Sequence, residues 1–302
     1  MKPLSALPAL LGALVLPAAA TGPMDPAAAL QAEEANAVAV HDAIAPSVVK
    51  IDVSWQEPPP KLAPGLEQFL REDSQGKTTP RRGTGTGVLW DTSGHVVTSS
   101  TVVEAAGGSF KVTLADGSRR DATLVAVDNR SKVAVLKLEG ATTGLRPATP
   151  GSSGSLRVGQ RIYVMGASFG KALVFVDGML GAITSAYADD GYQDLAVNTS
   201  LNPGTAGGPL FDSAGRMVGL VKGIYVGNTG GGFVLGTASD DIAWVVPRLL
   251  ADGHVERAQI GISIQDLDAL PLPPNLPAGV AVFAVDAAGA GERAGLRPRD
   301  GD

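Results

Sequence analysis

Short apolar stretches separated by turns rich in Gly, Asp and Ser recur along most of this chain. One set of stretches is S-V-V-K-I-D-V, G-T-G-V-L-W, H-V-V-T, S-F-K-V-T-L, D-A-T-L-V-A-V and K-V-A-V-L-K-L. A second set is R-I-Y-V-M-G, L-V-F-V, G-M-L-G-A-I-T, L-A-V-N-T, M-V-G-L-V-K and G-F-V-L-G-T. Two sets of about six short strands predict an all-β fold of two antiparallel barrels.

Composition supports this prediction and excludes several classes of function. The chain has 39 Gly, 21 Pro and only 5% aromatic residues, which favours short strands and turns over long helices. Its net charge of −6, with no long basic tract, argues against nucleic acid as a partner. There is no Cys and no His pair at ligand spacing, so we expect no disulfide, no metal site and no cofactor.

The N-terminal region predicts export. Residues 1–20 place one Lys before an apolar run that ends in small residues, which is typical of a cleaved signal peptide. A transmembrane anchor is the alternative, but the run is shorter than the ~20 residues that a span needs. We therefore expect a periplasmic or extracellular protein. Residues 21–36 are predicted to be a linker. A short helix is predicted after them, and Pro46 is expected to end it.

The order of these segments resembles the HtrA (Deg) family of exported trypsin-like serine proteases, which have a double β-barrel and one or two PDZ domains. The segments V-V-T-S-S-T-V-V, D-N-R-S-K-V-A-V-L-K-L and L-N-P-G-T-A-G-G-P-L-F-D resemble those that carry the catalytic His, Asp and Ser of the family. The resemblance runs from about Ala37 to Asp302. It implies a protease-type domain at 37–256 and the N-terminal part of a PDZ domain at 257–302, with the rest of that domain expected beyond the sequence.

All three catalytic positions of the family are replaced here. The His position falls on Thr101, the Asp position on Lys132 and the Ser position on Ala206. Thr101 has no group that titrates near neutral pH, Lys132 carries the wrong charge to stabilise an imidazolium, and Ala206 has no nucleophile. We therefore expect no useful proteolysis.

Other residues are poor substitutes for the lost triad. Thr205 is next to Ala206, but its side chain is expected to point in another direction. His95 is six residues before Thr101, roughly 20 Å along a strand. His41 and His254 fall in the N-terminal helix and near the domain junction, so we expect all three histidines to be structural or exposed.

Two binding features are implied by the resemblance. The backbone of Gly204, Thr205 and Ala206 corresponds to an oxyanion hole, which would receive a peptide carbonyl or a carboxylate without cleaving it. The alternative is that its glycines persist only because the fold needs their backbone angles. Lys222, on the strand that resembles a wall of the specificity pocket, either favours acidic side chains or is simply solvated, and we favour the second.

The second feature lies in the PDZ-like piece. There, Gln259, Ile260, Gly261 and Ile262 resemble the segment that holds the C-terminal carboxylate of a peptide.

The hypothesis we favour is that the chain is an exported HtrA-like pseudoprotease. It would bind unfolded or C-terminal peptides, or modulate an active HtrA-type protease, and the resemblance implies a homotrimer. Two alternatives stay open. One is an active serine endopeptidase of protein quality control with a rearranged catalytic group, and the other is a structural assembly partner that binds no peptide.

Overall fold

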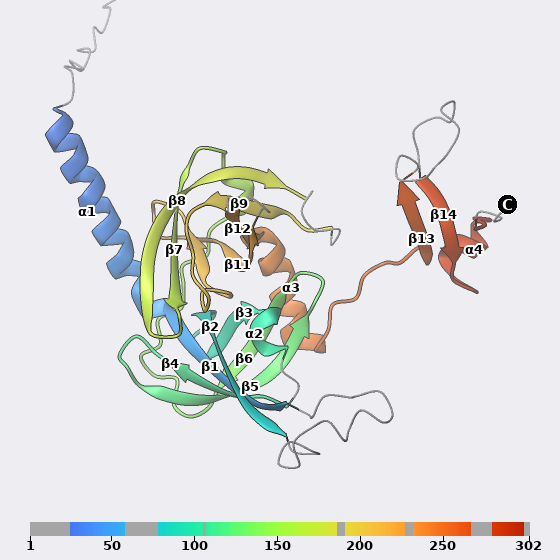
Figure 1. The fold of residues 1–302 in the computed structure, drawn as a ribbon, viewed down its shortest axis with the longest axis horizontal. Helices are drawn as coiled ribbons and strands as arrows, with labels where there is room; N and C mark the ends of the chain where they lie inside the picture. The colour runs from blue at the N-terminus through green and yellow to red at the C-terminus, as the bar shows by residue number, and fades with distance from the viewer. Residues whose placement is uncertain are drawn as a thin grey trace, which may run out of the picture.

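The computed structural model describes residues 25–57, 78–104, 107–185, 191–226, 232–266 and 280–298. The expected signal peptide lies outside these residues. Figure 1 shows two β-barrels side by side, and the predicted all-β double barrel is confirmed.

The first barrel closes with the strand order β1–β2–β3–β6–β5–β4. Its antiparallel strands are β1 (Val48–Glu57), β2 (Thr79–Leu89), β3 (His95–Ser99), β4 (Ser109–Thr113), β5 (Arg119–Asp128) and β6 (Val133–Leu138). Alternate side chains such as Ile51, Val96 and Leu136 are fully buried inside it. This is the outcome that the apolar alternation in the sequence predicts.

The second barrel closes with the order β10–β11–β12–β9–β8–β7. Its strands are β7 (Arg161–Ser168), β8 (Ala172–Thr184), β9 (Asp194–Asn198), β10 (Pro209–Phe211), β11 (Met217–Val226) and β12 (Gly232–Ala238). The two stretches L-V-F-V and G-M-L-G-A-I-T are one strand, β8, because Asp177 and Gly178 continue the pairing with β7. The sequence pattern did not predict β10, because this strand is too short to show an apolar alternation.

A further apolar cluster lies between the two barrels, contains side chains from both and joins them. Val97 and Val133 of the first barrel pack in it with Tyr163 and Phe211 of the second. Helix α3 (Ser239–Asp252) adds its buried face to the same cluster. It ends at Gly253, which adopts a left-handed conformation with φ 73° that glycine accepts readily.

Helix α1 (Pro26–Ile44) begins well before the predicted position. Most of the segment expected to be a linker is helical, because Asp25 caps the first turn, Pro26 is compatible with a first helical position and the alanines that follow favour helix. Only Val40 and Ile44 are buried, and Figure 1 shows the N-terminal end of the helix projecting away from the barrels. Among the described residues no helix is long and apolar enough to span a membrane.

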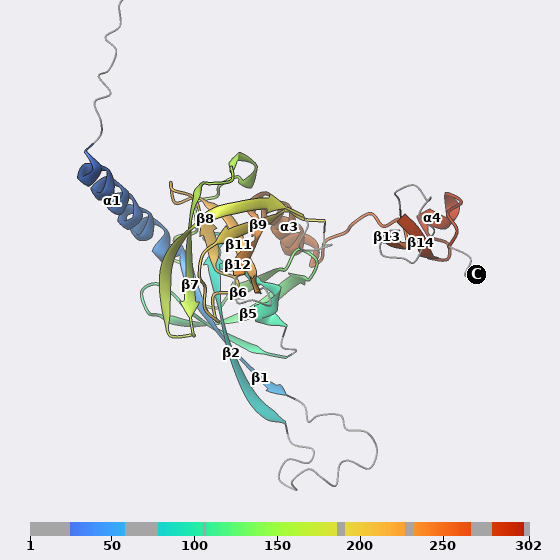
Figure 2. The ribbon, with the colours of Figure 1, turned by 45° about the horizontal axis from the view of Figure 1, so that its top comes forward.

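The C-terminal region forms a small separate unit. Strands β13 (Ile262–Asp266) and β14 (Val280–Val285) pair antiparallel, and the short helix α4 (Ala290–Arg293) follows. Figures 1 and 2 both show this unit away from the barrels, beyond an extended segment that leaves α3.

Candidate functional site

The loop of residues 202–208, between β9 and β10, is fixed against the first barrel by one threonine. The backbone N–H of Thr86 donates to the carbonyl oxygen of Ala206 at 2.9 Å. The hydroxyl of Thr86 donates to the carbonyl oxygen of Gly204 at 2.8 Å and accepts from the N–H of Ala167. Strand β2 of one barrel therefore sets the path of a loop in the other.

Two glycines in this loop occupy places where no side chain fits. Gly204 has φ 97°, and a Cβ there would lie 2.2 Å from the carbonyl oxygen of Ala167. Gly207 has φ 78°, and its Cβ would lie 2.2 Å from both Thr86 O and Thr98 Oγ1. The loop keeps these glycines because both the backbone angle and the close contact require them.

The loop offers two backbone donors that no described residue uses as a hydrogen-bond partner. The N–H of Thr205 donates to Asn202 O at 3.3 Å, and that of Gly207 donates to Val221 O at 2.8 Å. Within the described part of the chain, the N–H groups of Gly204 and Ala206 donate no hydrogen bond. Two such donors on a tight turn suit a carbonyl or carboxylate oxygen.

The three positions expected to replace the catalytic triad meet around this loop. Thr101 lies in α2 (Ser100–Val103), directly after β3, and Lys132 lies in the β5–β6 turn. The N–H of Ser100 donates to Lys132 O at 3.0 Å, which joins these two segments. A Cβ on Gly207 would lie 2.8 Å from the backbone nitrogen of Ser99, so Ala206 is next to the same place.

None of the three side chains supplies a catalytic group. The Thr101 hydroxyl is hydrogen-bonded to Ser99 Oγ at 2.9 Å. Among the described residues, Lys132 Nζ has neither an ion-pair partner nor a hydroxyl at hydrogen-bonding distance. With a methyl group at Ala206, these three described positions supply neither a nucleophile nor a general base.

Two neighbouring hydroxyls in the described structure, those of Thr205 and Ser100, are not placed to act as the nucleophile. The hydroxyl of Thr205 donates to Asn202 O at 2.7 Å, and the residue is 3% exposed, so it points away from the open side of the loop. Ser100 Oγ has no hydrogen-bond partner in the described structure. Ser100 is 0% exposed, however, and no substrate carbonyl reaches a fully enclosed hydroxyl.

The histidines lie elsewhere. His95 is at the far end of β3 from Thr101, with Nδ1 2.6 Å from Asp91 Oδ2. His41 packs edge-on against Phe175, and His254 is an exposed residue after α3. No histidine is therefore placed to act as a base at Ala206.

Sequence reasoning missed a buried charge cluster beside Lys132. Arg257 binds the Asp128 carboxylate through both terminal nitrogens, at 3.0 and 2.5 Å, and donates to Tyr192 Oη at 3.0 Å. Ser131 also donates to Asp128. Burial raises the pKa of the Asp128 carboxyl, but the bonds from Arg257 and Ser131 outweigh it and lower that pKa below the usual value.

The expectation that Lys222 is solvated is wrong. Its side chain is 7% exposed and pairs with Asp194, which is 0% exposed, on neighbouring parts of the second barrel. A lysine on an alternating strand gives no sign of such a partner, because Asp194 lies 28 residues earlier on β9.

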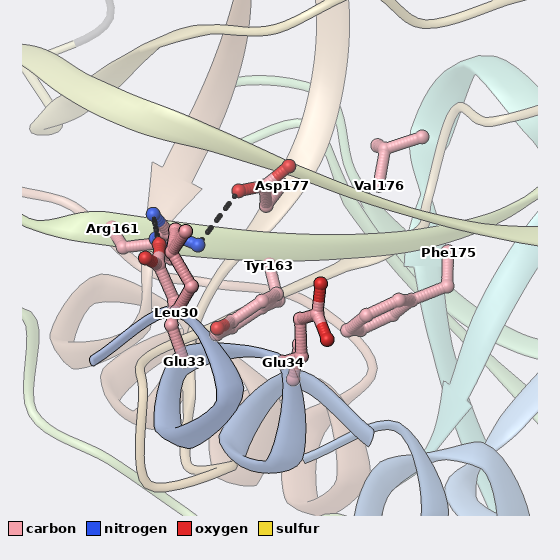
Figure 3. Close-up of a pocket in the computed structure, with 9 residues that line it drawn as sticks. Leu30, Glu33, Glu34, Arg161, Tyr163, Phe175, Val176 and Asp177 are labelled. Carbon is pink, nitrogen blue, oxygen red and sulfur yellow. Dashed lines mark ion pairs between the residues drawn. The ribbon is translucent and has the colours of Figure 1, made fainter. Parts of the chain in front are cut away.

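A cavity of about 380 Å³ lies between α1 and the strands β7 and β8 (Figure 3). Arg161 pairs there with Glu33 of the helix and with Asp177 of β8, the latter at 3.2 Å. Tyr163 and Phe175 stack at 5.2 Å between ring centroids. No residue of the 202–208 loop lines this cavity, so it is separate from the candidate site.

Two closed antiparallel six-stranded barrels, with this loop between β9 and β10, define the trypsin-like class of fold. A model of the trypsin-like peptidase domain family matches residues 85–220. Protease Do-like 1, chloroplastic, of Arabidopsis thaliana is 34% identical over 219 residues, which are 66% of this chain and 49% of that protein. A probable periplasmic serine endoprotease DegP-like of Halomonas elongata is 33% identical over 242 residues, 78% of this chain and 50% of that protein.

Solved structures agree with this classification. The HtrA-type protease AlgW with decapeptide matches with a TM-score of 0.70 and 24% identity over 87% of this chain and 83% of that chain. The crystal structure of Deg5 matches with a TM-score of 0.56 and 27% identity over 74% of this chain and 98% of that chain. The chain therefore belongs to the HtrA/Deg family of trypsin-like proteases, and it spans about half the length of the two curated relatives.

Proposed function

We propose that this chain is an exported HtrA-family pseudoprotease that binds unfolded or C-terminal peptide segments at the 202–208 loop without cleaving them. The observation that carries the proposal is the combination of two unused N–H donors at Gly204 and Ala206 with a methyl group in place of the nucleophile. A carbonyl that enters this turn is held and polarised, but nothing attacks it.

Similarity to other proteins supports peptide binding and export. One structural neighbour is described with a bound decapeptide, and several relatives are described as periplasmic. We extend both properties to this chain. We also propose that it associates with an active HtrA-type protease and forms a homotrimer through its 37–256 domain.

A second carboxylate site is proposed in the C-terminal unit, as part of a PDZ domain that begins at residue 257. Gly261 has φ 72°, and its carbonyl accepts from Asp286 N at 2.8 Å, while the carbonyl of Ile260 accepts from Gly291 N at 2.6 Å. The N–H groups of Ile260 and Gly261 donate no hydrogen bond within the described residues. In this arrangement, Gln259–Ile262 presents donors to the end of a peptide that adds beside β13.

The test is the binding of fluorescein-labelled casein, an unfolded protein, measured by anisotropy with the mature chain. An Ala206→Trp variant covers the loop with an indole, and we expect binding at least about tenfold weaker, as for the loss of a central contact. An Ala214→Trp variant places the same side chain on an exposed turn and is expected to bind normally.

Equal binding by both variants would move peptide binding away from the loop. No binding of casein, together with co-purification with an active relative, would favour the purely structural partner. Cleavage of casein would favour the active endopeptidase.

A further inference from the structure

We propose that a cavity beside Thr101 receives a basic side chain, lysine or arginine, of the peptide held at the 202–208 loop. This inference rests on the function proposed above and names the class of peptide that the site selects. The cavity measures about 340 Å³ and lies between β1, β2 and α2, at one end of the first barrel. Its walls include Trp55, Gly83, Thr101, Val102 and Glu104.

Two glycines on β2 leave space for the apolar side chains that line the cavity. A Cβ on Gly83 would lie 3.3 Å from the Trp55 ring, so the indole lies over this bare backbone. A Cβ on Gly85 would lie 2.4 Å from Val102, which covers the next bare position. The G-T-G-T-G strand therefore lets one indole and one valine line the same cavity.

The same strand connects the cavity to the loop. Thr84 lines the cavity, and Thr86, two residues further along β2, holds the carbonyls of Gly204 and Ala206. Thr101 also lines the cavity, and it lies two residues after Ser99, whose backbone nitrogen would be 2.8 Å from a Cβ on Gly207. Alternate side chains of an extended peptide are roughly 7 Å apart. A peptide whose carbonyl lies at Ala206 can therefore place a nearby side chain in the cavity.

The chemistry of the walls selects a positive charge on an apolar stem. Glu104 is exposed, it is the one charged residue among the described residues that line the cavity, and it has no ion-pair partner among them. The indole and the valine suit the methylene groups of lysine or arginine, and the carboxylate suits the charged end. An acidic side chain would meet the Glu104 charge instead.

Arg81, which lies opposite Trp55 on the neighbouring strand, does not neutralise Glu104. Arg81 pairs with Trp55 across β1 and β2, but its Nε lies 2.5 Å from Glu57 Oε2. The carboxylate of Glu104 is therefore available to a cation from outside the described chain.

The test uses labelled nine-residue alanine–serine peptides in which one lysine, norleucine or glutamate is moved along the sequence. Norleucine has the straight apolar chain of lysine without its charge. At the best position we expect the lysine peptide to bind about tenfold more tightly than the norleucine peptide, and the glutamate peptide to bind most weakly. Glu104→Gln is expected to bring lysine and norleucine within about twofold of each other, since the remaining contacts are apolar.

The matched control is Glu139→Gln, which removes an exposed carboxylate that lines no part of this cavity. It is expected to keep the full lysine preference. If Glu104→Gln also keeps that preference, or if all peptides bind equally, the cavity assignment is overturned while peptide binding stands. If no peptide binds at all, the proposed function fails and this inference fails with it.

Discussion

The 202–208 loop and the segments that carry Thr101 and Lys132 differ in what holds them. The loop is fixed by main-chain contacts with no spare room, at Gly204 and at Gly207. At the other two positions only the backbone is engaged across segments, while the Thr101 side chain is exposed and Lys132 Nζ is unpaired among the described residues. We therefore expect stability to depend on the main-chain geometry of the loop and much less on the side chains at Thr101 and Lys132.

The largest effect should come from adding one methyl group to the loop. Gly207→Ala forces a Cβ to within 2.2 Å of Thr86 O and Thr98 Oγ1 at a φ of 78°. We expect the free energy of unfolding to fall by at least about 3 kcal/mol, measured by urea denaturation. Gly117→Ala is the matched control because Gly117 has φ 79° with no neighbour within 4 Å, and it should cost only about 1 kcal/mol. Equal losses would show that the close contact at Gly207 does not matter.

A smaller, pH-dependent effect is expected at Asp128, beside Lys132. Asp128→Asn weakens a buried pair with Arg257, and we expect a loss of about 2–4 kcal/mol near pH 7. The pKa of Asp128 is lowered in the folded protein, so its contribution is present above the unfolded value of about 3.9 and is lost as the pH falls through the folded pKa. The stability difference between the two proteins should therefore shrink as the pH falls below about 4.

The control for this prediction is Asp121→Asn. Asp121 pairs with Lys111 at 2.8 Å on the surface, and exposed pairs contribute at most about 1 kcal/mol. A difference at Asp128 that grows toward low pH would contradict the assignment of a depressed pKa.

The smallest effect should come from Thr101 itself. Thr101→Val keeps the shape of the side chain and removes one partly buried hydrogen bond with Ser99 Oγ, which still accepts from the backbone N–H of residue 101, so we expect the free energy of unfolding to change by about 1 kcal/mol or less in thermal denaturation. A loss above about 2 kcal/mol would mean that this side chain is structural, and the contrast with the loop would be lost.

Most of the barrel architecture could be predicted from the sequence, because buried strands leave an alternating apolar pattern. The predicted number of strands in the second barrel was right only because two errors cancelled: the sequence pattern divided β8 into two strands and did not predict β10. Thr101, Lys132 and Ala206 were expected to replace the catalytic triad because the segments around them resemble those of the family, and this assignment stays a prediction.

Partners that are distant in the sequence could not be predicted. Arg257 meets Asp128 across 129 positions, and Lys222 is buried against Asp194 because two strands of a closed barrel bring them together. The cavity beside Thr101 depends on which face of β2 its glycines occupy. The sequence alone does not show that Trp55 and Val102 cover the bare backbone at these glycines.

The most direct test of the central claim is hydrolysis of unfolded casein by the purified mature chain, beside Ala206→Ser and the triple variant Thr101→His, Lys132→Asp, Ala206→Ser. Lys132 has φ 60°, a conformation that aspartate also adopts, so the triple variant is compatible with the turn. We predict no cleavage by the starting chain or by Ala206→Ser, which lacks a base, and clear cleavage by the triple variant. Cleavage by the starting chain would contradict the account and require a nucleophile other than residue 206.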